Sequence, residues 1–208
     1  MHKVAPHDPE VAFFWKWFEG KSRELASNLE NEDVIRDLDH RVSLFADGSL
    51  SWEIGPGLHA PFCLVISPGG QKVLLPITKA IISQAPQVEG WEFQPAKPPK
   101  KWSPCFSFES TTGGQITVDA TKWEYLLLEY PDRLYEILIK TTGSSEITQQ
   151  DKGTAAEIVV DGTLGELKRL EAVYAIEIVE EFREDLRPKA SPIGVLGAHL
   201  DSLLMRGS

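Results

Sequence analysis

The sequence predicts an α+β fold, in which an N-terminal helical hairpin precedes two β-β-α-β repeats that form mostly antiparallel sheet with helices on one face. Three observations lead to this class. Residues 1–48 place apolar side chains at helical spacing, two later stretches share one order of strands and helix, and no stretch approaches the roughly 18 apolar residues of a membrane span. The chain has 208 residues, 42% hydrophobic and 25% charged, which is typical of a globular protein.

Two helices are expected at the start of the chain. Asp8 followed by Pro9 is a helix-start signature, because the carboxylate accepts from free amides and proline is well tolerated in the first turn. The first helix is expected over about 9–29. A second helix is expected after Asn31, which can cap it, and should close near 46–48. The apolar stripe of the second helix is Ile35, Leu38, Val42 and Phe45.

The rest of the chain is interpreted as an internal repeat. The first copy has strands at 50–55 and 62–66, a helix over about 72–85 and a strand around 91–93. The second copy has strands at 124–130 and 135–139, a polar loop over 141–152, a helical stretch through 155–162 and a strand at 173–179. The offset is about 73 residues at the paired strands, so we expect two copies of one structural unit. For 155–162 a strand is the alternative, because its β-branched residues and glycines lower helix propensity.

The expected domain organisation has four parts that together form one compact domain. These are a helical hairpin packed on the sheet (1–48), a first half with a proline-rich connector (49–104), a hairpin with the second half (105–190), and a C-terminal helix (191–204). The connector itself covers 94–104, where prolines favour an extended chain. Residues 205–208 resemble an expression-vector remnant and are left out of the fold prediction.

Charge and cysteine usage narrow the classes of partner and compartment. There are 31 acidic and 21 basic side chains, a formal charge of −10, which repels nucleic acid and anionic membranes and favours a protein partner with a basic surface. Residues 119–208 carry 17 of the acidic and 10 of the basic groups. The two cysteines show no CxxC spacing, which favours a reduced compartment, and the sequence predicts a cytoplasmic protein.

No motif carries a specific chemistry. Metal-ligand spacings such as HExxH are absent, and 67–70 follows a strand as a nucleophile elbow would but lacks the G-x-S-x-G pattern. Residues 69–72 lack the Walker spacing for phosphate. Cys63 is expected to be a buried small hydrophobe with a raised pKa. We therefore expect no catalytic residue, metal site or cofactor, which favours a non-catalytic protein and leaves enzyme activity open.

Two segments are candidate binding sites. In the aromatic run 13–18, Trp15 and Trp17 either pack in the core or lie outside as anchors for a protein partner. In the connector, Lys100, Lys101 and Trp102 either bind an acidic partner, a proline-recognition groove or single-stranded nucleic acid, or the tryptophan packs on the sheet while the lysines stay in water.

The residues predict first a non-catalytic binding protein of adaptor, inhibitor or immunity type. Trp15 or Trp17 would anchor the partner, and the carboxylates of 119–208 would supply charge. The alternative is a small-molecule-binding domain or enzyme. Its pocket would lie between the two repeated halves, near Trp52, Glu53, His59 and Trp102.

Several short landmarks resemble a family of uncharacterised bacterial proteins. They are Phe-Trp-Lys-Trp-Phe at 14–18, Trp-Glu-Ile-Gly at 52–55, Ala-Pro at 85–86, Gly-Trp-Glu-Phe at 90–93 and Leu-Gly-Glu at 164–166. The resemblance covers about 14 to 180. It implies a bacterial, cytosolic setting and an α+β fold, and it transfers no catalytic residue because the family has no assigned activity.

Overall fold

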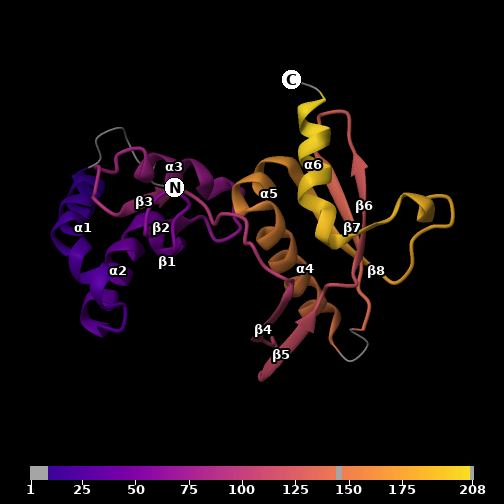
Figure 1. The fold of residues 1–208 in the computed structure, drawn as a ribbon, viewed down its shortest axis with the longest axis horizontal. Helices are drawn as coiled ribbons and strands as arrows, with labels where there is room; N and C mark the ends of the chain where they lie inside the picture. The colour runs from indigo at the N-terminus through magenta and orange to yellow at the C-terminus, as the bar shows by residue number, and fades with distance from the viewer. Residues whose placement is uncertain (1–8, 144–146, 207–208) are drawn as a thin grey trace. The chain divides into compact units, whose positions relative to one another are not determined.

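The computed structural model describes residues 9–143 and 147–206, so the predicted capping residue Asp8 lies outside the described residues. The α+β class is confirmed. The chain divides into two compact units, Met1–Lys97 and Pro98–Ser208, and the boundary falls within the predicted connector (Figure 1). The single compact domain expected from the sequence stays a prediction.

The first unit contains the predicted helical hairpin and a three-stranded sheet. Its helical segments are α1 (Pro9–Ser27), α2 (Glu32–Ser43), η1 (Phe45–Gly48), η2 (Lys72–Leu74) and α3 (Leu75–Ile82). Its strands are β1 (Ser51–Gly55), β2 (Phe62–Ser67) and β3 (Trp91–Gln94). The sheet order is β1-β2-β3, with β1 antiparallel and β3 parallel to the central strand β2.

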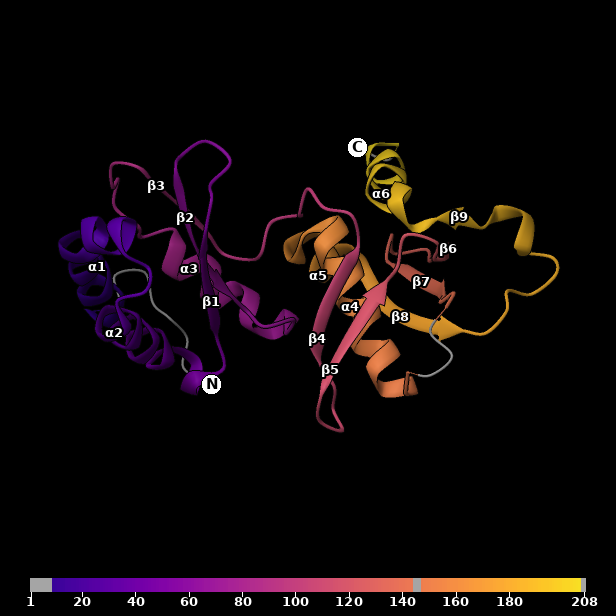
Figure 2. The ribbon, with the colours of Figure 1, turned by 60° about the horizontal axis from the view of Figure 1, so that its bottom comes forward.

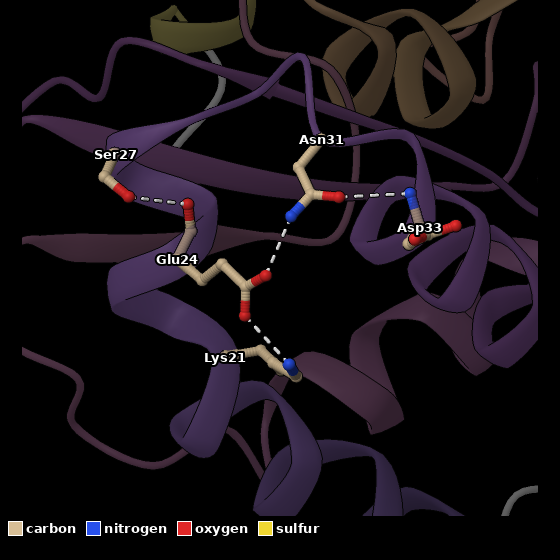
Figure 3. Close-up of polar contacts among 5 residues, drawn as sticks. All are labelled: Lys21, Glu24, Ser27, Asn31 and Asp33. Carbon is tan, nitrogen blue, oxygen red and sulfur yellow. Dashed lines mark hydrogen bonds and ion pairs between the residues drawn. The ribbon is translucent and has the colours of Figure 1, made fainter.

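The junction between α1 and α2 is held by side chains (Figure 3). Asn31 is the N-cap of α2, as predicted: its side-chain oxygen accepts from the Asp33 amide at 3.2 Å, and its Nδ2 donates to Glu24 at 2.8 Å. Lys21 donates to the other carboxylate oxygen of Glu24. The first helix ends at Ser27, earlier than predicted, because Asn28 accepts from the amide of Glu30 and turns the chain.

The core of the first unit covers one face of its sheet. Strand register places Leu64 and Ile66 of β2 on the same face as Trp91 and Phe93 of β3, and all four belong to one hydrophobic cluster with α1, α2 and α3. Phe18 of α1 packs edge to face on Trp91 and Phe93, with ring centroids 5.0 and 5.4 Å away. The aromatic run of α1 is therefore mainly a core element.

The second unit contains a hairpin and a four-stranded sheet. Its strands are β4 (Cys105–Glu109), β5 (Gln115–Asp119), β6 (Glu124–Glu129), β7 (Tyr135–Lys140), β8 (Val173–Val179) and β9 (Ser191–Pro192). Its helical segments are α4 (Gln149–Leu164), α5 (Glu166–Ala172), η3 (Arg187–Lys189), η4 (Ile193–Val195) and α6 (Leu196–Met205). The sheet order is β8-β7-β6-β9, with β6 antiparallel and β8 parallel to β7.

One face of this sheet is covered by α4 and α6 (Figures 1 and 2). Tyr135, Ile137 and Ile139 alternate along β7 and are buried against small and branched residues of these helices. The buried helix residues are Ala155, Ala156, Val159, Val160, Leu164, Leu196 and Leu200. The hairpin β4–β5 packs on the same cluster through Val118.

The second unit departs from the prediction at three points. Residues 155–162 form the predicted helix rather than the alternative strand, but α4 begins already at Gln149, within the predicted polar loop, because Thr148 caps it by accepting from the Asp151 amide at 3.1 Å. The short helix α5 was not predicted: Gly165, at a φ of 79°, ends α4 and starts α5. Ser191–Pro192 does not open the C-terminal helix but pairs with β6 as β9.

Candidate functional site

Trp15, a predicted partner anchor, lies in the core. Its side chain is 3% exposed, and its indole Nε1 donates to the carbonyl of Ile81 in α3 at 2.9 Å. Its ring packs edge to face on Phe93, 4.7 Å between centroids. A fully covered indole cannot contact a partner, so the core alternative is the correct one for Trp15.

Trp17 lies at the rim of the same core. Its ring is half-buried, and the Arg41 guanidinium of α2 stands 4.8 Å from its centroid. Asp37 holds that guanidinium at 2.9 Å. The exposed aromatic of the run is instead Phe13, with 69% of its surface in solvent, which is not one of the predicted anchors.

The first-unit residues of the predicted pocket have separate surroundings. The Trp52 indole, on the core-facing side of β1, donates to Asp39 of α2 at 3.0 Å. Glu53 lies on the opposite face of the sheet. His59 is exposed in the β1–β2 turn, where its backbone amide donates to Glu92 at 3.0 Å. The carboxylate that holds the His59 turn is thus Glu92 of β3, not Glu53.

Cys63 matches its predicted character. It is buried in β2, and the pKa of its thiol is raised to about 12 by burial and by the nearby carboxylates of Glu92 and Glu53. A thiol with such a pKa stays protonated and is a weak nucleophile.

The connector residues belong to the second unit and pack on a helix rather than on the sheet. The Trp102 ring lies on Gly162 of α4, where a Cβ atom would overlap it, and 5.4 Å from the ring of Phe106. The Lys100 amide donates to the Gly162 carbonyl at 2.7 Å, and its ammonium stands 5.7 Å from the Trp102 centroid. Lys100 and Lys101 are exposed. Trp102 is therefore a packing residue, and the lysines beside it stay in water, as the second of the two alternatives states. A pocket joining Trp102 to Trp52, Glu53 and His59 stays a prediction.

An exposed surface of the second unit is formed around two tyrosines. Tyr130 and Tyr174 are 41% and 72% exposed, and their rings pack edge to face with centroids 6.1 Å apart. They line a hollow of about 590 Å³, and we call its lining residues the tyrosine surface: Tyr130, Pro131, Asp132, Leu134 and Tyr174.

Backbone geometry presents both rings to solvent. The β6–β7 turn closes through bonds from the Arg133 amide to the Tyr130 carbonyl and from the Tyr130 amide to the Leu134 carbonyl, both 2.9 Å. Arg133 has a φ of 61°, the left-handed conformation that a three-residue hairpin loop needs. Opposite this turn, Tyr135 pairs with Val173 and Glu136 with Ala175, so Tyr174 is the extra residue of a β-bulge. Bulges redirect side chains, which explains its exposure.

Carboxylates surround the tyrosine surface. The Tyr130 hydroxyl donates to Glu136 at 2.6 Å, and this bond raises the pKa of Tyr130. Glu177 is exposed on the same sheet face as Glu136, because Ala175 pairs with Glu136 and Glu177 follows two residues later. The one cation of residues 129–137 is Arg133. A hollow with aromatic walls and an acidic rim suits a cationic group.

Sequence reasoning did not select this site. Tyr130 and Tyr174 both fall within predicted strands, where alternation places Tyr174 opposite Val173 and Ala175 and gives no sign of a bulge. The available signals were the turn sequence Pro131-Asp132-Arg133 and the acidic excess of 119–208.

A second polar cluster clamps the β4–β5 hairpin to α4. The Asp151 carboxylate is fully buried and accepts from the Thr111 amide and the Ser110 hydroxyl at 3.0 Å, and from the Thr148 hydroxyl at 2.7 Å. These bonds, the Thr111 amide first, lower the pKa of Asp151. The carboxylate is satisfied by neutral donors, so its role is structural.

Within residues 9–143 and 147–206, no three His, Cys, Asp or Glu side chains are grouped as a metal site. Over the same residues, no helix combines the length and the apolar character that crossing a membrane requires. The chain matches no family model and shows no significant similarity to a curated protein or a solved structure. The resemblance to uncharacterised bacterial proteins therefore stays a prediction.

Proposed function

We propose that this chain is a non-catalytic binding protein, of adaptor, inhibitor or immunity type, that contacts a protein partner with a basic surface. The observation that carries the proposal is the tyrosine surface, where two exposed rings line a hollow within the acidic part of the chain. The proposal keeps the bacterial cytoplasm as the setting, which the family resemblance implies.

The chemistry of the tyrosine surface supports a protein partner. Tyrosine is enriched among the residues that dominate binding energy, since its ring buries a large apolar area and its hydroxyl still reaches a polar group. Tyr130 already has that arrangement, with an exposed ring and a hydroxyl fixed on Glu136. The surrounding carboxylates would speed encounter with a basic partner and disfavour acidic ones. We therefore propose Tyr130 and Tyr174, instead of Trp15 and Trp17, as the residues that anchor the partner.

Capture of partners from bacterial lysate tests this proposal. The bait is the full chain, compared with the double variant Tyr130→Ala/Tyr174→Ala. A matched control, Phe13→Ala/Leu58→Ala, removes two apolar side chains of the first unit that are 69% and 61% exposed. We expect a stoichiometric partner that wild type and control retain and the tyrosine variant loses. Equal retention by the tyrosine variant, or no partner at low salt, would refute the proposal.

We also propose that the two β-β-α-β segments are a repeat. In each segment two strands form a hairpin, and a helical crossover then leads to a third strand that lies parallel to the second, so the second strand is the middle one of the three. Strands β1 and β6, and likewise β2 and β7, start about 73 residues apart. This agreement in order, direction and spacing supports a repeat, and the tyrosine surface then belongs to the turn of its second copy.

A further inference from the structure

We infer that the tyrosine surface binds an arginine side chain of the partner, with the guanidinium against the rings of Tyr130 and Tyr174 and facing the carboxylates of Glu136 and Glu177. This inference rests on the proposed function and names the chemical group that its site takes. The occupant is a basic peptide segment, exposed on the partner, that contains arginine.

The tyrosine rings supply the first part of the argument. An edge-to-face pair leaves ring surface open to a third group, and Tyr174 exposes 72% of its surface. A cation within about 6 Å of a ring centroid is attracted by the ring quadrupole. The Tyr130 ring is held in place, because its hydroxyl donates to Glu136 at 2.6 Å. The partner therefore does not have to order this ring on binding.

The carboxylates supply the second part. Glu136 uses its Oε2 for the Tyr130 hydroxyl, and its Oε1 accepts no hydrogen bond from the described residues. Glu177 is exposed two residues beyond the pairing partner of Glu136 on the same sheet face. A planar guanidinium carries five donors, so it can stack on a ring while it donates to carboxylates beside the ring. An ammonium group is more strongly hydrated and does not stack.

The chain's own cation does not occupy this position. Arg133 lies on the turn and is not among the residues that line the hollow. Its charge acts instead on Tyr135, whose pKa is raised by burial and by Glu129, and partly opposes that rise. The groups that act on Tyr130 are Glu136, Tyr174 and Glu177, all of which raise its pKa. The field around the tyrosine pair is therefore negative.

Peptide titration followed by NMR of the tyrosine rings tests this inference on the full chain. The probe is a blocked peptide of alternating glycine and arginine, compared with matched peptides in which lysine or neutral citrulline replaces arginine. The chain has four tyrosines, and Tyr125 and Tyr135, which are 0% and 1% exposed, serve as internal controls. We expect only the Tyr130 and Tyr174 signals to move with the arginine peptide. Binding should weaken by about fivefold with lysine and be lost with citrulline.

Variants then locate the binding groups. Tyr174→Ala should weaken arginine-peptide binding by about fivefold, and Glu136→Gln with Glu177→Gln should weaken it further and flatten its salt dependence. Phe13→Ala should bind as wild type does. Equal binding of the citrulline peptide, or shifts confined to other residues, would overturn the inference. If the peptide fails while a lysate partner is still lost in Tyr130→Ala/Tyr174→Ala, the inference is wrong and the proposed function stands. If the peptide binds as described and no partner is captured, the site binds arginine, and the proposed function as a protein-binding protein is refuted.

Discussion

Trp15 joins α1 to α3 through both its ring and its indole nitrogen. Replacement by alanine leaves a large cavity and removes the indole hydrogen bond to the Ile81 carbonyl, which then keeps its bond from the Gln84 amide. We therefore expect Trp15→Ala to lower the free energy of unfolding by about 3–5 kcal/mol. Phe13→Ala, on the same helix but exposed, should change it by less than about 0.5 kcal/mol. Urea denaturation measures both. If a Trp15 variant lost partner binding, the loss would therefore be explained by unfolding and would not show that Trp15 lies at an interface. Similar stability of the two variants would contradict the core position of Trp15.

Asp151 should make stability depend on pH in the acid range. Its hydrogen bonds hold its folded-state pKa below the value of a free carboxyl, near 3.9. The stabilisation is therefore complete above that value and is lost as the pH falls through the lower folded pKa. We expect Asp151→Asn to have a lower urea midpoint than wild type at pH 7, with the difference shrinking below about pH 4.

The matched control for Asp151 is Glu180→Gln, which removes an exposed carboxylate. Its urea midpoint should follow that of wild type at each pH, since it loses no buried hydrogen bond. A constant difference between wild type and Asp151→Asn from pH 7 to pH 2 would show that ionisation of Asp151 does not contribute.

Single side chains were the hardest feature to predict from the sequence. Helical spacing places Phe14, Trp15 and Phe18 near one face, yet it does not tell which indole a second element covers, and Trp15 is covered by α3 from 66 positions away. Tyr174 was missed for a related reason. A bulge depends on how two strands align, and here the aligned residues, Tyr135 and Val173, are 38 positions apart. The alternation of side chains within one strand cannot reveal such a bulge.

Helix α4 offers a test of how the connector docks. Alanine is normally favoured over glycine in a helix by about 1 kcal/mol, and Gly153→Ala, with nothing near its added Cβ, should gain that amount. At Gly162 the added methyl would overlap the Trp102 ring, so we expect Gly162→Ala to destabilise the chain by about 1–3 kcal/mol. Thermal unfolding compares the two variants. Equal stabilisation by both would show that Trp102 does not rest on α4.

The predicted elements succeed where local signals are strong. The capping side chain of Asn31 and the apolar run of β2 determine their elements without help from distant residues, and both were predicted. Helix α5 has only seven residues and begins at a glycine turn, so it carries too little periodicity to be recognised. Ser191–Pro192 becomes a strand because β6 offers it a pairing edge, which is a tertiary effect.

The two hairpin turns are stabilised in different ways by the strand that follows each crossover helix. In the first segment Glu92, the second residue of β3, accepts from the amides of Leu58 and His59 and so fixes the turn. In the second segment Tyr174, the second residue of β8, packs its ring on Tyr130 instead. In the first turn both carboxylate oxygens of Glu92 already accept hydrogen bonds from the protein itself. An exposed aromatic pair leaves its surface available, which is why we assign binding to the second turn.

For the whole molecule, the two hydrophobic clusters predict that each unit folds independently. The cluster of the first unit and that of the second share no residue and draw on separate sheets and helices. We expect residues 98–208, expressed alone, to give amide NMR signals that match those of the full chain, including the Tyr130 and Tyr174 ring signals. Residues 1–97 serve as the reciprocal sample.

In the full chain, Ile137→Ala should lower the melting temperature of the second unit alone, and Leu64→Ala that of the first. If the isolated segments are unfolded and both variants shift one common transition, the chain is the single cooperative domain that the sequence predicts. Arginine binding would then have to be measured in the full chain only.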